Sequence, residues 1–133
     1  MTGITDLAEL LRSLEPVRRP DPYVLVSLPP VLAGPELRDL AEAAIREDEG
    51  VSLVLRRLDA DDRGIAYDFV AAWVTLTVHS SLEAVGMAAA VSAALAQVGI
   101  PCNLLAGYHH DHLLVPIERA DDAIEALRRL ADA

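Results

Sequence analysis

Hydrophobic and polar residues follow two different periods along the chain, and each change of period predicts a helix or a strand. Residues 4–14 place leucine and isoleucine at helical spacing and predict a short amphipathic helix. Residues 23–28, YVLVSL, are β-branched and apolar, which predicts a buried strand. A longer helix is expected from Glu36 until Gly50 stops it, followed by a strand at 51–57.

The second half of the chain predicts a similar series. A polar turn comes first, then a long extended segment, an alanine-rich helix, two strands joined by a histidine-rich turn, and a last amphipathic helix. These elements are expected, in that order, at residues 59–64, 65–78, 82–98, 102–108, 112–117 and 118–132.

An internal repeat organises these elements. The run YVLVSL, a turn, a helix and EGVSLVL align with WVTLTV, a turn, a helix and VGIPCNLL, so that Gly50 falls opposite Gly99. The first and last helices also resemble each other. The second half has the strand and helix order of a ferredoxin-like βαββαβ unit whose last strand is missing or supplied from elsewhere.

The repeat predicts an α+β protein of two ferredoxin-like units with antiparallel sheets and helices on one face. We place the units at residues 1–70 and 71–133. The first unit is expected to be a permuted copy, because its helix comes first.

Charge and cysteine content narrow the classes of function. All eleven basic residues are arginine, against twenty-one acidic residues, and the formal net charge is -10. Such a surface disfavours nucleic acids and anionic membranes. The single cysteine, Cys102, excludes an intramolecular disulfide, and no signal peptide or membrane-spanning run is evident, so we expect a cytoplasmic protein.

The stretch 73–116, WVTLTVHSSLEAVGMAAAVSAALAQVGIPCNLLAGYHHDHLLVP, resembles the ACT domain, specifically the small tandem-ACT proteins. The resemblance extends more weakly over YVLVSLPP and EGVSLVL. It implies a regulatory module that binds an amino acid or another small metabolite at the interface between units. The loop between the first strand and the first helix generally supplies the contacts in this family.

A zwitterionic ligand needs hydrogen-bond donors for its carboxylate and an anion for its ammonium group. Donors are expected at a helix start near Leu82 and Val85, and Asp111 is the candidate ammonium partner. The resemblance to tandem-ACT sensors also points to Asp111, and it adds residues of the hairpin. The full set of candidate ligand contacts is Ser80, Ser81, Leu82, Glu83, Val85, Gly86, Tyr108, His110 and Asp111.

Each candidate also has a purely structural interpretation. Ser80 or Ser81 is equally suited to cap a helix, and Asp111 to occupy a turn. Gly86 either lets a ligand approach or lets a helix pack closely. Glu83 either reads a basic ligand side chain or favours the helix dipole.

The cluster of His109, His110, Asp111 and His112 does not predict a metal site. Only alternate side chains of a strand share a face, and no spaced set of ligands accompanies them. Cys102 lies in an expected buried strand, where a free cysteine is usually a small core residue. No nucleophile elbow or phosphate loop is present, so we expect no enzyme, no metal and no cofactor.

Two functions of different classes remain. The first is a small-molecule sensor, with an amino acid as the expected ligand and with any regulated enzyme as a separate polypeptide. The second is an assembly module with an ACT-like fold and no physiological ligand. A homodimer is expected under either hypothesis, because a small ferredoxin-like sheet leaves edges or faces to cover.

Overall fold

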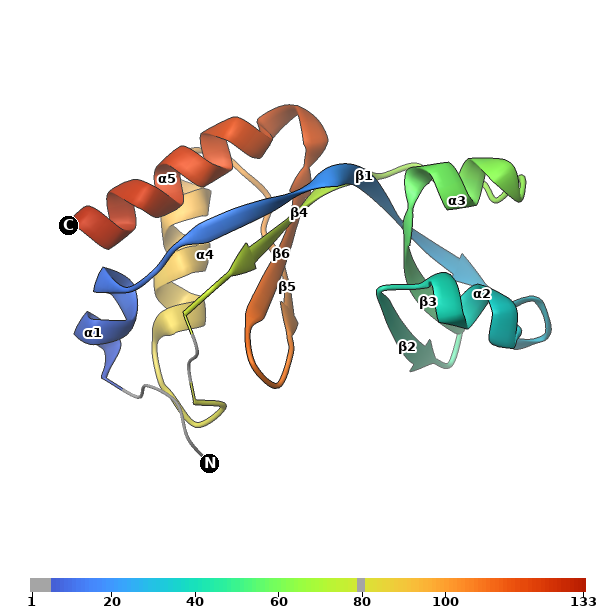
Figure 1. Ribbon diagram of the computed structural model, residues 1–133, viewed down its shortest axis with the longest axis horizontal. Helices are drawn as coiled ribbons and strands as arrows, with labels where there is room; N and C mark the ends of the chain where they lie inside the picture. The colour runs from blue at the N-terminus through green and yellow to red at the C-terminus, as the bar shows by residue number, and fades with distance from the viewer. Residues whose placement is uncertain (1–5, 79–80) are drawn as a thin grey trace. The chain divides into compact units, whose positions relative to one another are not determined.

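A computed structural model describes residues 6–78 and 81–133. The chain divides into two compact units. Unit 1 consists of Met1–Arg19 and Ala72–Ala133, and unit 2 of Pro20–Ala71. Strand β1, at Pro16–Leu28, gives its first residues to unit 1 and the rest to unit 2. Each unit is an antiparallel sheet with helices (Figure 1).

Unit 2 runs strand, helix, strand, strand, helix. After β1 come η1 (Pro30–Leu32), α2 (Pro35–Leu40), β2 (Ala43–Glu47), β3 (Gly50–Arg56) and α3 (Arg57–Asp62). The strand order is β2-β3-β1, with both pairs antiparallel. Alternate residues of β1 and β3 face the helices and form the core, which is built from Val24, Val26, Ala33, Leu37, Val51, Leu53, Leu55 and Ala60.

Unit 1 has the same plan, with its fourth strand taken from the start of β1. Its elements are α1 (Leu7–Arg12), β4 (Val70–Leu76), α4 (Met87–Gln97), β5 (Asn103–Ala106), β6 (Asp111–Pro116), η2 (Ile117–Arg119) and α5 (Ala120–Asp132). The order β1-β4-β6-β5 is that of a ferredoxin-like unit. The sequence predicted that the last strand of this unit is missing or supplied from elsewhere, and β1 is that strand.

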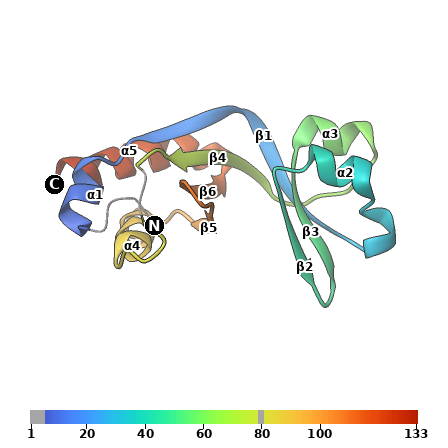
Figure 2. The ribbon, with the colours of Figure 1, turned by 60° about the horizontal axis from the view of Figure 1, so that its bottom comes forward.

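The helices of unit 1 bury one face of its sheet. Alternate residues of β4 and β6, such as Val74 and Leu113, meet Leu10 of α1, Val91 of α4 and Leu127 of α5 in one core. Helix α5 lies on the β1 side of this sheet, and α4 lies toward β5 and β6 (Figure 2). Among the described residues, no helix is long and apolar enough to span a membrane.

The predicted fold class is confirmed. Helix α1 belongs to unit 1, and residues 20–71 follow the ferredoxin-like order directly from β1. The predicted division of the chain between residues 70 and 71 stays a prediction. The two units of the structure are defined by compactness, and by that criterion residues 1–19 group with residues 72–133.

The helix expected from Glu36 to Gly50 is wrong beyond Leu40. The chain becomes extended at Ala41, and the Glu42 N–H donates to the Val54 carbonyl at 2.9 Å. Pairing with β3 overrides the helical propensity of AEAAIRE. Gly50 is the first residue of β3, and β3 has the place in unit 2 that β6 has in unit 1. Gly99 instead precedes β5, so the predicted alignment of Gly50 with Gly99 is wrong as well.

Two further boundaries differ from the sequence prediction. The segment expected as a polar turn forms α3, because Ala60 packs into the core and the Asp59 carboxylate is held by Arg56, whose Nε lies 3.1 Å from it. The alanine-rich helix begins at Met87 rather than Leu82, since the preceding residues form turns.

Candidate functional site

The loop between β4 and α4 carries most of the predicted ligand contacts. Ser80 lies outside the described residues. The buried Ser81 accepts a hydrogen bond from the Glu83 N–H on its hydroxyl, at 3.1 Å, and one from the Ala84 N–H on its carbonyl, at 3.0 Å. These bonds close a local turn. The expected helix N-terminus near Leu82 and Val85 is therefore wrong, and the Ser81 hydroxyl stabilises the turn instead.

Gly86 is the residue from which α4 starts. Its backbone is left-handed, with φ 103°, and a Cβ at this position would lie 3.0 Å from Cδ2 of Leu7. The close approach is thus to helix α1 of the same unit. Of the two interpretations of this glycine, the geometry supports packing.

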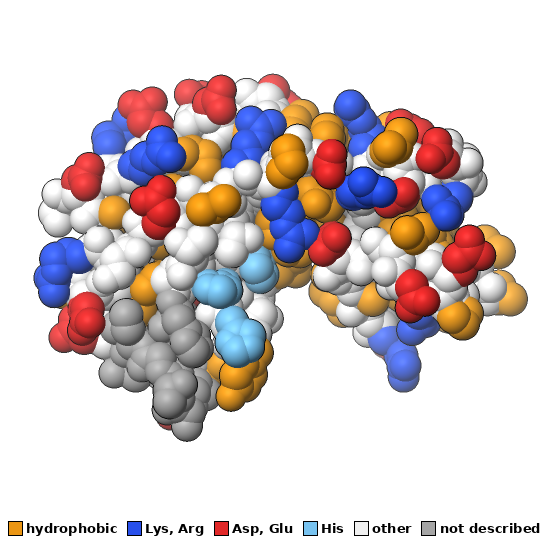
Figure 3. All heavy atoms as spheres, viewed as in Figure 1, with side chains coloured by type: hydrophobic (Ala, Val, Ile, Leu, Met, Phe, Trp, Pro, Cys, Tyr) orange, Lys and Arg blue, Asp and Glu red, His pale blue; other side chains and the backbone are white. Residues whose placement is uncertain are grey.

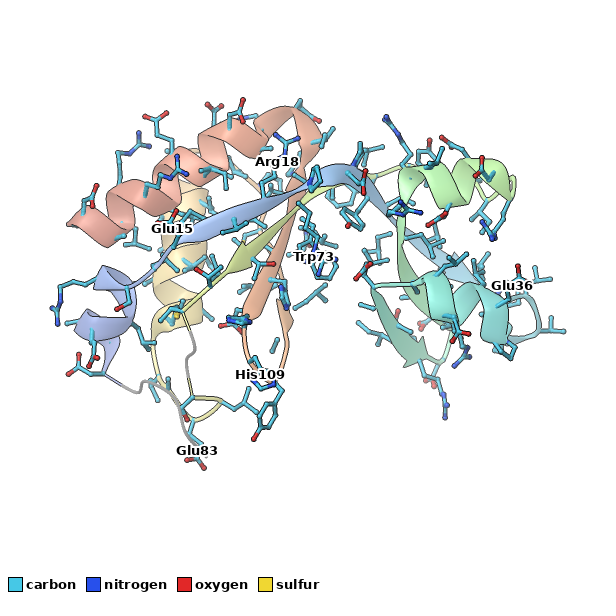
Figure 4. All side chains as sticks on the ribbon, in the orientation of Figure 1. Glu15, Arg18, Glu36, Trp73, Glu83 and His109 are labelled. Atoms are coloured by element: carbon cyan, nitrogen blue, oxygen red, sulfur yellow. The ribbon has the colours of Figure 1, made fainter. Side chains whose placement is uncertain are left out.

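The loop presents apolar side chains to solvent. Leu82 is 53% exposed and Val85 is 82% exposed. Glu83 is also exposed, and its side chain points away from the hairpin that carries His109 (Figure 4). Leu82 and Val85 thus give this loop an exposed aliphatic surface. The predicted contact between Glu83 and a basic side chain of the ligand stays a prediction.

The hairpin between β5 and β6 carries the other predicted contacts. The Gly107 N–H donates to the His110 carbonyl at 2.9 Å and closes the turn. Tyr108 is 65% exposed and packs edge-on against His109, with ring centroids 5.0 Å apart. The histidine side chains of the described residues gather at this end of unit 1 (Figure 3). Asp111 begins β6 opposite Ala106.

Partial burial perturbs two ionisable groups here. Burial raises the pKa of the Asp111 carboxyl, while His112 and His110 oppose that rise. Burial lowers the pKa of His112, with Arg19 and His110 lowering it further and Asp111 opposing. A partly desolvated carboxylate gains most from a cationic partner, so Asp111 is suited to an ammonium group. Within the described part of the chain, no group of three or more His, Cys, Asp or Glu side chains is arranged to hold a metal ion.

The sheet face away from the helices carries a polar network that the sequence analysis did not single out. The Trp73 Nε1–H donates to the Thr75 hydroxyl at 3.1 Å, and that hydroxyl lies 3.0 Å from Nδ1 of His112. The Arg19 guanidinium lies over the Trp73 ring, 4.2 Å from its centre. The alternation in WVTLTV is the signal that places Trp73 and Thr75 on one face.

Unit 2 contains a groove that the sequence analysis also missed. It has a volume of about 750 Å³ and is formed by the loop between β1 and α2 together with the segment after α3. Its lining is Ser27, Leu28, Val31, Leu32, Gly34, Pro35, Glu36, Leu37, Arg63, Gly64, Ile65 and Ala66. The internal repeat could have indicated this groove, because the loop between β1 and α2 is the counterpart in unit 2 of the loop between β4 and α4.

Two charged side chains of opposite sign line this groove. Glu36 lies on α2 (Figure 4), and Nη2 of Arg63 is 3.8 Å from its carboxylate. The Arg38 Nε–H donates to the Ala33 carbonyl at 2.7 Å, which fixes the loop beside the groove. The groove thus combines an aliphatic lining with one carboxylate and one guanidinium.

Comparison with known proteins agrees with this architecture. Two ACT domain family models match the chain, one over residues 2–72 and the other over residues 69–129. The chain therefore belongs to the ACT domain family. No curated protein matches it significantly.

Solved structures with the same architecture include one close relative. A protein of unknown function from Vibrio cholerae, named as a possible transport protein, is 39% identical, with a TM-score of 0.83 over 98% of this chain and 99% of that one. A protein from Agobacterium tumefaciens is 18% identical, with a TM-score of 0.65 over 89% of each chain. The regulatory subunit of aspartate kinase from Thermus flavus is 13% identical, with a TM-score of 0.65 over 87% of this chain and 96% of that one. The latter two likenesses concern the fold alone.

Proposed function

We propose that this protein is a regulatory module that binds a free amino acid on the loop joining the first strand of a unit to its first helix. The observation that carries the proposal is the groove of unit 2, which is formed by that loop and contains both Glu36 and Arg63. Membership of the ACT domain family supports a regulatory role for such binding.

The chemistry of the groove matches a zwitterion with an aliphatic side chain. Arginine is suited to a carboxylate because its planar guanidinium offers paired N–H donors. Glu36 offers an acceptor for the ammonium group. The lining by Leu28, Leu37 and Ile65 excludes water from one side of a bound molecule and favours an apolar side chain.

The existing ion pair makes little difference to the cost of binding. Glu36 has a side chain that is 90% exposed, and its pairing with Arg63 at 3.8 Å lies near the limit for an ion pair. Exposed pairs of this kind contribute about 0–1 kcal/mol. A ligand that replaces this pair disrupts only a weak contact, provided that Arg63 keeps its hydrogen bond to the Asp59 carbonyl at 3.3 Å.

A second position for the ligand follows from the repeat. The predicted contacts in unit 1 are retained as a proposal centred on Asp111, whose partly buried carboxylate suits an ammonium group. Either position transmits a signal only through the difference in affinity between two states of the protein, because a ligand that binds both states equally shifts neither.

The test is a thermal-shift screen of the full chain against the twenty amino acids, followed by calorimetric titration of each hit. Binding to the native state raises Tm in proportion to RT ln(1 + [L]/Kd). We expect hits among aliphatic amino acids, and we expect Arg63→Gln and Glu36→Gln each to weaken them at least tenfold.

Matched variants identify the position. Arg129→Gln and Glu125→Gln remove a comparable exposed pair on α5, with a distance of 2.7 Å, and should leave affinity unchanged. Loss of binding in Asp111→Asn but not in Arg63→Gln would move the ligand to unit 1. No shift with any amino acid at millimolar concentration would refute the proposal and favour an assembly module without a ligand.

A further inference from the structure

A basic cluster lies on the sheet face of unit 1 that points away from its helices. Its members are Arg19 of β1, Trp73 of β4 and His112 of β6, and these strands are neighbours in the order β1-β4-β6. The Arg19 guanidinium lies 4.2 Å from the centre of the Trp73 ring, and the His112 ring centre lies 5.1 Å from it. The indole therefore holds two basic groups beside each other (Figure 4).

The cluster is partly withdrawn from water. Trp73 is only 3% exposed, and Arg19 and His112 are half-buried. Partial burial strengthens the attraction between a guanidinium and an anion, because fewer water molecules screen the charges. A guanidinium that lies over an aromatic ring still presents N–H donors at its edge, and that edge matches the oxygens of a carboxylate or a phosphate.

The charges around His112 are mainly positive. Burial lowers the pKa of His112, and the nearby charges of Arg19 on β1 and His110 in the hairpin lower it further. Asp111 on β6 acts in the opposite direction, and β4 carries no charged residue. Two basic groups thus face one carboxylate at this place, in a protein whose formal net charge is -10. A bound anion would relieve the repulsion between the basic groups.

We infer that this face of unit 1 binds a small oxyanion at the Arg19 guanidinium, and that protonation of His112 beside it strengthens the binding. We call this place, formed by Arg19, Trp73 and His112, the Arg19 site. The inference does not depend on the amino-acid ligand proposed above, because the Arg19 site requires neither Arg63 nor an ammonium group on the ligand.

The overall charge restricts the ligand to a small anion. A protein with a net charge of -10 repels a polyanion such as a nucleic acid over its whole surface. A single carboxylate or phosphate group responds mainly to the local field at Arg19, because salt screens the more distant charges. Both groups share the oxyanion chemistry that a guanidinium recognises.

The first test uses the fluorescence of Trp73, which is the only tryptophan in the chain. The full chain is titrated with sodium sulfate, as a stand-in for phosphate, and with sodium formate, at constant ionic strength set by sodium chloride. Both anions keep their charge between pH 7.5 and 5.5. We expect a saturable change with at least one of them, with affinity several-fold higher at pH 5.5 because His112 is then more protonated. The anion that saturates distinguishes a phosphate site from a carboxylate site.

Calorimetric titration of variants locates the site without relying on fluorescence. Arg19→Gln should abolish binding of the anion, and His112→Asn should remove the rise in affinity at pH 5.5. Arg18→Gln is the matched control, because it removes the same charge from the adjacent residue of β1, which pairs with Asp121 at 3.5 Å. Circular dichroism of each variant checks that it is folded.

The titrations of wild-type protein decide the inference even if a variant fails to fold. No saturable response to sulfate or formate at either pH would overturn it, as would equal affinity at the two pH values. Among folded variants, binding that persists in Arg19→Gln, or an equal loss in Arg18→Gln, would also overturn it.

Discussion

The Thr75 hydroxyl oxygen lies 3.0 Å from Nδ1 of His112, and it also accepts the indole N–H of Trp73. The indole is a donor only, so the Thr75 hydroxyl keeps its single proton to donate, and we expect it to donate to Nδ1 of His112. With Nδ1 as the acceptor, the proton of the neutral imidazole lies on Nε2. We therefore predict that this network selects the tautomer of His112, the residue next to the candidate Asp111.

This tautomer is directly measurable. Long-range proton–nitrogen correlation spectra at neutral pH should show His112 protonated at Nε2, with Nδ1 as the unprotonated nitrogen. Thr75→Val removes the hydroxyl while keeping the side-chain shape, and it should produce a mixture of the two tautomers. An Nδ1–H tautomer in the wild-type protein would show that the hydrogen bond runs in the opposite direction.

The lowered pKa of His112 predicts a loss of stability in mild acid. Because the folded protein binds a proton at this site less readily than the unfolded chain, whose ordinary value is 6.5, stability is complete above that pH and declines below it. Asp111 acts in the opposite direction, because its raised pKa favours the folded state as the pH falls toward the ordinary value of 3.8.

The variant His112→Asn isolates the histidine contribution, since the Asn carbonyl still offers an acceptor to Thr75. Between pH 7.5 and 5.5, the Tm of wild-type protein should fall more than the Tm of the variant. Because His112 also lowers the pKa of Asp111, the comparison is repeated in an Asp111→Asn background, which removes the contribution of that carboxyl. Parallel curves for the two proteins would contradict the assignment.

Gly107 is required by the space at the hairpin turn. A Cβ there would lie 2.8 Å from the His110 carbonyl oxygen and 3.1 Å from Nε2 of His112. We expect Gly107→Ala to lower the free energy of unfolding by about 1–3 kcal/mol, because the backbone contact cannot move without opening the turn. Gly34→Ala, where nothing lies within 4 Å, is the matched control for chemical denaturation.

The sequence was most informative where hydrophobic periodicity and tertiary packing agree. Strand β3 and helix α5 are close to their predicted positions because their apolar faces are continuous. The segment after Leu40 was misassigned because AEAAIRE is helical by propensity, and only the ladder to β3 makes it a strand. Helix α3 was missed because it depends on the packing of Ala60 into the core of unit 2, a contact between residues distant in sequence.

The candidate site was harder to predict for a related reason. The residues of the β4 to α4 loop were chosen on the expectation that a helix begins at Leu82, and a turn stands there instead. The network of Trp73, Thr75 and His112 joins two strands, and Thr75 and His112 are 37 residues apart in sequence. A short sequence pattern therefore cannot predict that they meet. The groove of unit 2 depends on how the segment after α3 returns beside the loop that follows β1.

Gly86 distinguishes packing from ligand contact experimentally. Its left-handed backbone makes any L side chain costly by about 1–2 kcal/mol, and the contact with Leu7 adds a second penalty. Gly64→Ala supplies the backbone penalty alone, because φ there is 66° and nothing lies within 4 Å. We therefore expect Gly86→Ala to destabilise the protein more than Gly64→Ala does.

The double variant Leu7→Ala with Gly86→Ala separates the two penalties. If the glycine serves packing, the cost of Gly86→Ala should fall once Leu7 is shortened, because only the backbone term remains. Urea denaturation of the four variants and the parent protein measures this coupling. An unchanged cost in the Leu7→Ala background would show that the helix contact is not what requires a glycine at this position.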